Sequence, residues 1–168
     1  MNNTSIAIVR MESESELVEM VSPSTIIKLD DTINTYYNVS IGCAWEIGIV
    51  FYNYGIDLDY KVDANTSSIY FGVGMHLICM DLTTGEMMFN RRLDSVFYEI
   101  MTDIRSEYYV VMCELDLYVY KNRDLQWKTG FRDTLTEYSI IDEKYIKVLL
   151  DNDDELIYAI EDGKLIFE

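Results

Sequence analysis

The chain has 168 residues, of which 49% are hydrophobic and 13% aromatic, so it can bury a core and is not disordered. Thirty acidic residues against thirteen basic ones give a formal net charge of −17. This charge argues against partners such as nucleic acid or an anionic membrane, because binding to either requires a basic surface. Fourteen tyrosines and a single proline favour β-sheet.

The first quarter of the chain predicts strands around one short helix. IAIVRM at 6–11 is typical of a strand, and Ser13 and Glu16 then form the pattern of a capping box before an apolar segment. We expect a helix at 13–21 that ends before Pro23, inserted between the first two strands. Three more strands complete this unit, and they are expected at 25–30, 34–41 and 44–52.

The rest of the chain predicts three further units of four strands. Short β-branched and tyrosine-rich segments alternate with polar turns, a pattern that favours antiparallel hairpins. The expected strands are 56–62, 69–73, 76–82 and 86–93, then 96–104, 108–113, 115–121 and 125–131, and finally 137–142, 145–150, 155–161 and 164–168.

A large aromatic residue recurs once in each unit. Trp45, Phe89, Trp127 and Phe167 are spaced 44, 38 and 40 residues apart. A period near forty residues with four strands per unit is typical of β-propeller blades. We therefore expect Trp45 and Trp127 to pack between neighbouring blades.

Two segments resemble the repeats of quinoprotein-type and WD-type β-propellers. They are LICMDLTTGEMMF at 77–89 and LIYAIEDGKLIF at 156–167. The resemblance implies an all-β chain with one short N-terminal helix, in which residues 1–168 form a single propeller-like domain. The four antiparallel four-stranded repeats would form a small β-propeller or an open propeller-like arc. The resemblance carries over no cofactor residues. The alternative fold is a generic β-sandwich.

Little in the sequence indicates catalysis. His76 is the only histidine, and no nucleophile motif accompanies it. The acidic run 151–155 lacks the central glycine and distal glutamate of a calcium loop. Cys43, Cys79 and Cys113 lie in or beside apolar stretches, so we expect all three to be buried and structural. We expect no catalytic residue, metal or cofactor, and therefore no enzyme.

Two features that are missing from the sequence bear on its localisation. No basic cluster precedes an apolar run near the N-terminus, and no run approaches the roughly 20 apolar residues of a membrane span. These features favour a cytoplasmic protein.

Counting antiparallel strands assigns the connections to two ends of the repeats. One end is expected to carry eleven acids with Arg132 as the one obvious base, and the other a mixture of signs. The eleven acids are the predicted partner-binding residues: Asp30, Asp31, Asp57, Asp94, Glu114, Asp116, Asp133, Asp151, Asp153, Asp154 and Glu155.

An anionic surface steers a cationic partner toward it. In size, charge and lack of catalytic motifs, the chain resembles small acidic bacterial immunity proteins. That resemblance implies an acidic binding protein that neutralises a basic partner, such as a nuclease toxin domain, with Tyr52 or Tyr54 as an anchor. The alternatives are a propeller-type interaction scaffold or subunit of a larger assembly, and a hydrolase that uses carboxylates and a metal.

Overall fold

The structure is a computed structural model that describes residues 5–103, 105 and 107–167. Residues 1–4 lie outside the described residues. So do the last residues of two predicted strands, 104 and 168, and the side chain of Phe167, the fourth repeat aromatic.

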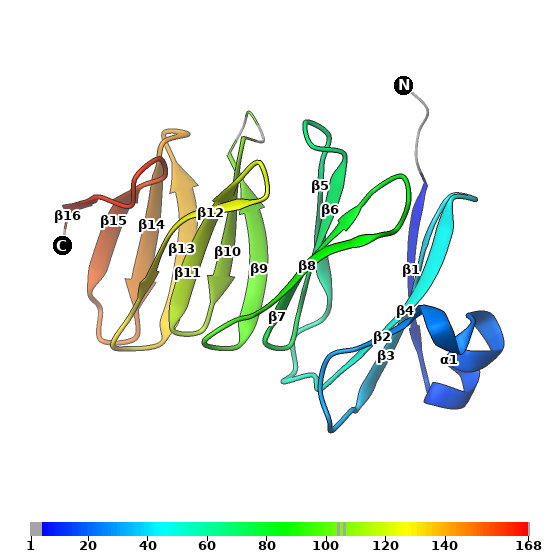
Figure 1. Ribbon diagram of the computed structural model, residues 1–168. Helices are drawn as coiled ribbons and strands as arrows, with labels where there is room; N and C mark the ends of the chain where they lie inside the picture. Colours follow the sequence, from blue (N-terminus) through cyan, green and yellow to red (C-terminus); the bar gives the residue numbers. More distant parts are fainter. Residues whose placement is uncertain (1–4, 104, 106, 168) are drawn as a thin grey trace.

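Four four-stranded sheets lie side by side in a row (Figure 1). The first sheet contains β1 (Ile6–Met11), β2 (Ile26–Lys28), β3 (Thr35–Ile41) and β4 (Trp45–Phe51), and the second β5 (Asp59–Asp63), β6 (Ser68–Val73), β7 (His76–Asp81) and β8 (Met87–Arg92). The third contains β9 (Phe97–Thr102), β10 (Tyr108–Cys113), β11 (Asp116–Lys121) and β12 (Asp124–Gly130), and the fourth β13 (Leu135–Ile141), β14 (Tyr145–Leu150), β15 (Glu155–Ala159) and β16 (Leu165–Phe167). The four predicted repeats are confirmed.

The first sheet departs from the predicted strand order. Its strands follow the order β1-β3-β4-β2, and β2 pairs with β4 in parallel, with Ile27 opposite Ile49. The helix α1 (Glu14–Met20) and the 3₁₀ turn η1 (Pro23–Thr25) form the connection that carries the chain across the sheet. Such a crossover permits parallel pairing, which a tight turn does not. The prediction of four consecutive antiparallel strands in this unit was therefore wrong.

The helix begins as its capping box predicts. The Ser13 side chain accepts a hydrogen bond from the backbone of Glu16 at 3.3 Å. Leu17, fully buried, packs with Met11, Val21 and Val50 against the first sheet. Within the described residues no helix combines the length and apolar character needed to cross a membrane.

Three apolar clusters bind the sheets into a row. One joins the first and second sheets, one the second and third, and one the third and fourth. None of the clusters among the described residues joins the fourth sheet to the first, and these two sheets lie at opposite ends of the row in Figure 1. The fold is therefore the open propeller-like arc rather than a closed ring.

Both tryptophans pack between neighbouring sheets, as the repeat predicts. The Trp45 indole donates to the carbonyl oxygen of Leu82 at 3.0 Å, and the Trp127 indole donates to that of Ile160 at 2.7 Å. Each ring covers a glycine of the next blade's turn. A Cβ atom on Gly163, whose φ is +70°, would lie 2.6 Å from the Trp127 ring. The Thr-Gly and Asp-Gly turns of the repeat thus form the surface on which the indoles pack.

The expectation of three buried cysteines was wrong for one of them. Cys43 lies exposed in the turn between β3 and β4, whereas Cys79 and Cys113 are buried. The turn places Cys43 outside the apolar strands on either side of it. Burial raises the pKa of the Cys79 thiol to about 11 and also raises that of Cys113.

We expect a thiol reagent to modify Cys43 alone in the folded protein. The reactive form of cysteine is the thiolate. Burial keeps the reagent away from Cys79 and Cys113 and disfavours ionisation of their thiols. Colorimetric titration at mildly alkaline pH should give one fast equivalent, and two more after denaturation. Rapid reaction of a second thiol without denaturant would contradict the placement of Cys79 and Cys113.

Candidate functional site

The candidate site is the end of the arc that we call the acidic end, the lower end in Figure 1. It is made by the connections at 29–34, 52–58, 74–75, 93–96, 114–115, 131–134 and 151–154. All eleven predicted acids lie in these connections or at the first residue of the strand that follows. The topology therefore gathers them on one end, as predicted from strand counting.

Backbone hydrogen bonds tie these connections to one another. The backbone N–H of Phe97 donates to the Gly74 carbonyl, and that of Glu114 donates to the Val96 carbonyl, each at 2.8 Å. Leu135 donates to Glu114 at 3.0 Å, and Asp151 donates to Thr134 at 2.9 Å. This series runs from the second sheet to the fourth, so the acidic end is a preorganised surface.

Four carboxylates form a compact group in the last two connections, which we call the acidic cluster: Asp133, Asp151, Asp153 and Asp154. The Asn152 amide donates to Asp133 at 3.0 Å and to Asp154 at 2.7 Å. No member of the cluster forms an ion pair with any residue that the structure describes. Its charge is therefore available to a partner.

Several other predicted acids already have basic partners. Lys128 pairs with Asp94 at 2.7 Å, and Lys147 pairs with Glu155 at 2.6 Å. Arg10 pairs with Asp57 at 3.4 Å. The prediction that Arg132 is the one obvious base at the acidic end was therefore wrong. The three paired cations lie within strands, and their side chains reach the acidic end.

Asp30 has a structural role between the first two sheets. Its carboxylate accepts a hydrogen bond from the backbone of Tyr52 at 2.9 Å and lies 3.4 Å from Nε2 of His76. His76 is buried, and its Nδ1 lies 3.2 Å from the side-chain oxygen of Asn90. The lone histidine thus lies where two sheets meet, and little of the Asp30 carboxylate faces solvent.

The helix adds acids that the sequence prediction missed. Because β1 is antiparallel to β3, it ends at the acidic end, and α1 follows beside it (Figure 1). Four exposed glutamates lie there: Glu12, Glu14, Glu16 and Glu19. The predicted strand order had placed this part of the chain at the other end, so no signal in the sequence linked these residues to the site.

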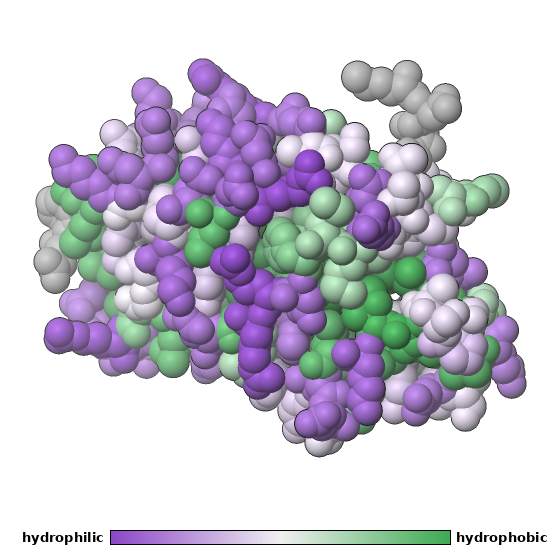
Figure 2. All heavy atoms as spheres, viewed as in Figure 1, coloured by the Kyte–Doolittle hydropathy of each residue, from purple (hydrophilic) through white to green (hydrophobic). Residues whose placement is uncertain are grey.

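Exposed apolar side chains accompany the charges at the acidic end. The rings of Tyr52 and Tyr54 lie edge to face with centroids 4.9 Å apart, and the two residues are 38% and 48% exposed. Leu115 is 38% exposed in the connection before β11. Figure 2 shows hydrophobic residues among hydrophilic ones at this lower end. The acidic end thus offers apolar anchors as well as charge.

The opposite end is more acidic than predicted. It also carries Asp63, Asp81, Glu86 and Asp142, which the sequence analysis left out. Asp63 is buried and accepts hydrogen bonds from the backbone of its own turn, as does Asp81. These two carboxylates shape turns, whereas Glu86 and Asp142 are exposed. Both ends therefore carry carboxylates without an ion pair among the described residues, and the acidic end adds the exposed glutamates of α1.

The Asp81 turn makes stability depend on pH. Backbone N–H groups of Thr84 and Thr83 hold the pKa of the Asp81 carboxyl below its ordinary value of 3.8. A lowered folded-state pKa gives stability that is present above the unfolded-state pKa and lost as pH falls through the folded one. We expect Asp81→Ala to lower the free energy of unfolding at neutral pH, with a difference from wild type that shrinks below about pH 4. Urea titrations of both proteins across this pH range measure the difference. A difference that does not change with pH would contradict the role of the ionised Asp81 carboxylate in the turn.

Among the described residues, no group of three or more His, Cys, Asp or Glu side chains is arranged to hold a metal ion.

Comparisons with known proteins identify the architecture. No protein-family model and no curated protein sequence matches the chain. Among solved structures, the chain is similar to BamB from Moraxella catarrhalis, with a TM-score of 0.53 at 13% identity over 96% of this chain and 50% of BamB. The β-propeller domain of Cps50 (Swd1) from Myceliophteria thermophila gives 0.52 at 11% identity, over 68% of this chain and 39% of that one. The computationally designed Ika4 protein gives a TM-score of 0.51 at 10% identity, over 70% of this chain and 76% of that one.

These similarities confirm propeller-type blades. At identities of 10–13% they show the fold alone, and the chain spans about half the length of BamB.

Proposed function

We propose that this protein binds a basic protein partner through its acidic end and neutralises it by occlusion. The observation that carries the proposal is the acidic cluster, four carboxylates without a basic partner among the described residues. The Asn152 amide and the backbone hydrogen bond from Asp151 to Thr134 hold its two connections together. In its most specific form, the proposal is an immunity protein that blocks a nuclease toxin domain in the cytoplasm. Its carboxylates would pair with the lysines and arginines that otherwise contact nucleic acid phosphates.

The arrangement suits rapid and specific capture. A net charge of −17 attracts a cationic protein from a distance, and such steering raises association rates by about 10- to 1000-fold at low salt. Affinity then requires desolvated contacts, which aromatic side chains supply at many interfaces. The exposed Tyr52 and Tyr54 pair and Leu115 offer such contacts beside the charges.

A second candidate is a propeller-type interaction scaffold or a subunit of a larger assembly. It is favoured by the open arc, because the outer face of the fourth sheet is only partly covered. Residues along β14 alternate between buried and half-buried, whereas every residue of β6 is buried. A scaffold of this kind would use the sheet face rather than the acidic end.

The two candidates are separated by neutralising each end in turn. The acidic-end variant replaces the acidic cluster with asparagines: Asp133→Asn, Asp151→Asn, Asp153→Asn and Asp154→Asn. The matched control removes four exposed acids from the opposite end: Glu86→Gln, Asp124→Asn, Asp142→Asn and Asp162→Asn. Both variants gain the same charge and keep nearly the same side-chain shapes.

We expect wild type and control to capture a basic protein from the native organism's lysate at low salt, and the acidic-end variant to lose it. Mass spectrometry identifies the captured protein, and a nuclease assay on it, with and without wild type, tests neutralisation. Equal capture by both variants would refute docking at the acidic end. Capture without inhibition would leave the scaffold function as the better account.

A further inference from the structure

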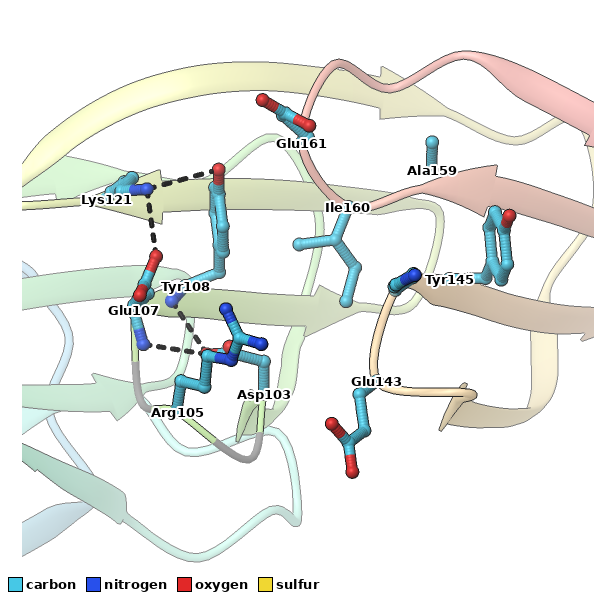
Figure 3. A pocket seen from close by; sticks show the side chains of 11 residues that line it. Asp103, Arg105, Glu107, Tyr108, Lys121, Glu143, Tyr145, Ala159, Ile160 and Glu161 are labelled. Carbon is cyan, nitrogen blue, oxygen red and sulfur yellow. Dashed lines mark hydrogen bonds and ion pairs between the residues drawn. The ribbon is translucent and has the colours of Figure 1, made fainter.

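A pocket of about 410 Å³ opens between the third and fourth sheets at the end opposite the acidic end (Figure 3). Its lining residues come from the described parts of the β9–β10, β13–β14 and β15–β16 connections and from the strand ends beside them. Ile160 and the half-buried rings of Tyr108 and Tyr145 supply apolar surface. The volume lies in the range of small-molecule sites, and the pocket is independent of the proposed function.

One wall of the pocket is fixed by its own polar contacts. The Asp103 carboxylate is buried and accepts hydrogen bonds from the backbone of Glu107 at 2.7 Å and of Tyr108 at 2.9 Å. The Lys121 ammonium donates to Glu107 at 3.1 Å and to the Tyr108 hydroxyl at 3.3 Å, and lies over the Tyr108 ring. This wall is therefore organised before any ligand arrives.

The remaining charges of the pocket have no ion-pair partner among the described residues. They are two cations and two anions: Arg105, Lys144, Glu143 and Glu161. In Figure 3 the Arg105 guanidinium lies beside Tyr108, and Glu143 and Glu161 lie on either side of Ile160. A ligand that carries one negative and one positive group would satisfy both kinds of side chain.

We propose that this pocket binds a zwitterionic ligand of the amino acid type, an ammonium and a carboxylate joined to an apolar side chain. Arg105 and Lys144 would receive the carboxylate, Glu161 and Glu143 the ammonium, and Ile160 and the tyrosines the apolar part. The charge of the whole protein favours this class over a simple anion, because the field of a chain at −17 repels net negative ligands but leaves a neutral zwitterion unaffected. Lys121 pairs with Glu107, and Asp103 is hydrogen-bonded within its own turn, so two acids and two bases of the lining remain. A ligand without net charge matches this balance.

The two tryptophans provide a built-in reporter with an internal control. The Trp127 indole donates to the carbonyl of Ile160, a residue of the pocket lining, whereas the Trp45 indole donates to Leu82 between the first two sheets. The indole N–H signals of these two residues can be followed separately by ¹H–¹⁵N NMR. Binding in the pocket should shift the Trp127 signal and leave the Trp45 signal in place.

The test titrates L-phenylalanine and L-leucine to millimolar concentrations. Their N-acetyl derivatives lack the ammonium, and their amides lack the carboxylate. We expect saturable shifts of the Trp127 signal with the free amino acids and at least tenfold weaker binding of both derivatives. Arg105→Gln and Glu161→Gln should each raise the Kd about tenfold or more, because charge-assisted hydrogen bonds are lost, while Arg132→Gln at the acidic end should leave it unchanged.

Four results would overturn the proposal. These are no shift with either amino acid, equal shifts of both indole signals, derivatives that bind as well as the free amino acids, and unchanged affinity in both pocket variants. In each ligand-free variant, the Trp45 signal verifies folding of the first two sheets and the Trp127 signal verifies packing of the fourth sheet on the third, so weaker binding is not confused with unfolding.

Discussion

Gly72→Ala is expected to lower the free energy of unfolding by about 3 kcal/mol, at the upper part of the range for an overpacked core. Gly72 lies in β6, and the fully buried ring of Phe97 from β9 packs directly over it. A Cβ atom added there would lie 2.1 Å from carbons of that ring. Because the Phe97 ring is fully buried, the ring or the two sheets must shift to admit the methyl group.

Urea denaturation of Gly72→Ala, Phe97→Leu and the double variant measures this effect. Because the clash involves the Phe97 ring, the double variant should be more stable than the sum of the two single changes predicts. Gly130→Ala is the matched control, since a Cβ there would meet its nearest atom at an ordinary 3.5 Å. Additive single changes, or an equal loss in the control, would contradict this packing between the sheets.

Trp127→Ala is expected to cost about 3 kcal/mol, at the low end of the range for a large aromatic because the ring is only partly buried. The indole packs on Tyr158 and Gly163 of the fourth sheet and donates to the Ile160 carbonyl at 2.7 Å. Its loss removes contact between the third and fourth sheets and leaves a backbone acceptor without its donor.

Trp127→Phe separates these two contributions. It keeps an aromatic ring but no N–H donor, so its cost should approach about 1 kcal/mol for the hydrogen bond, with some further loss from the smaller ring. Both variants are measured by denaturant titration. A loss below about 1 kcal/mol for Trp127→Ala would show that the ring does not hold the fourth sheet.

The repeat was predictable from the sequence because its aromatics and turns are spaced by the size of one blade. The turn at Gly85 and the turn at Gly163 adopt positive φ angles that glycine favours, so these two units matched the propeller pattern. The third unit closes the corresponding hairpin with a shorter turn that contains no glycine. Asn122 and Arg123 both adopt positive φ, at 51° and 73°, which side-chain-bearing residues rarely do and a sequence pattern does not reveal.

The course of the first unit was not predictable in the same way. β2 is three residues long, and alternation along so short a segment is the same for parallel and antiparallel pairing. The helix crossover reverses β1 relative to the predicted order. As a result, Arg10 reaches Asp57 at the acidic end, and the exposed glutamates of α1 lie beside it.

The placement of the eleven predicted acids at one end followed from strand counting, because connections alternate between two ends whatever the side chains do, but the placement of the α1 glutamates did not. Strand counting does not show whether each carboxylate is paired with a base or held between sheets. Asp30 joins two sheets, and Asp94 and Glu155 pair with lysines inside strands. Only the three-dimensional structure separates these from the acidic cluster, whose members lack basic partners among the described residues.

The most direct measurement is stopped-flow association of the captured basic partner with wild type, the acidic-end variant and the opposite-end control at increasing salt. We expect wild type and control to associate rapidly, with rates that fall steeply as salt rises, because surface charges are screened within about 10 Å at 0.1 M ionic strength. The acidic-end variant should associate about tenfold or more slowly at low salt, with a flatter salt dependence. Identical rates and salt dependences for the two variants would contradict docking at the acidic end.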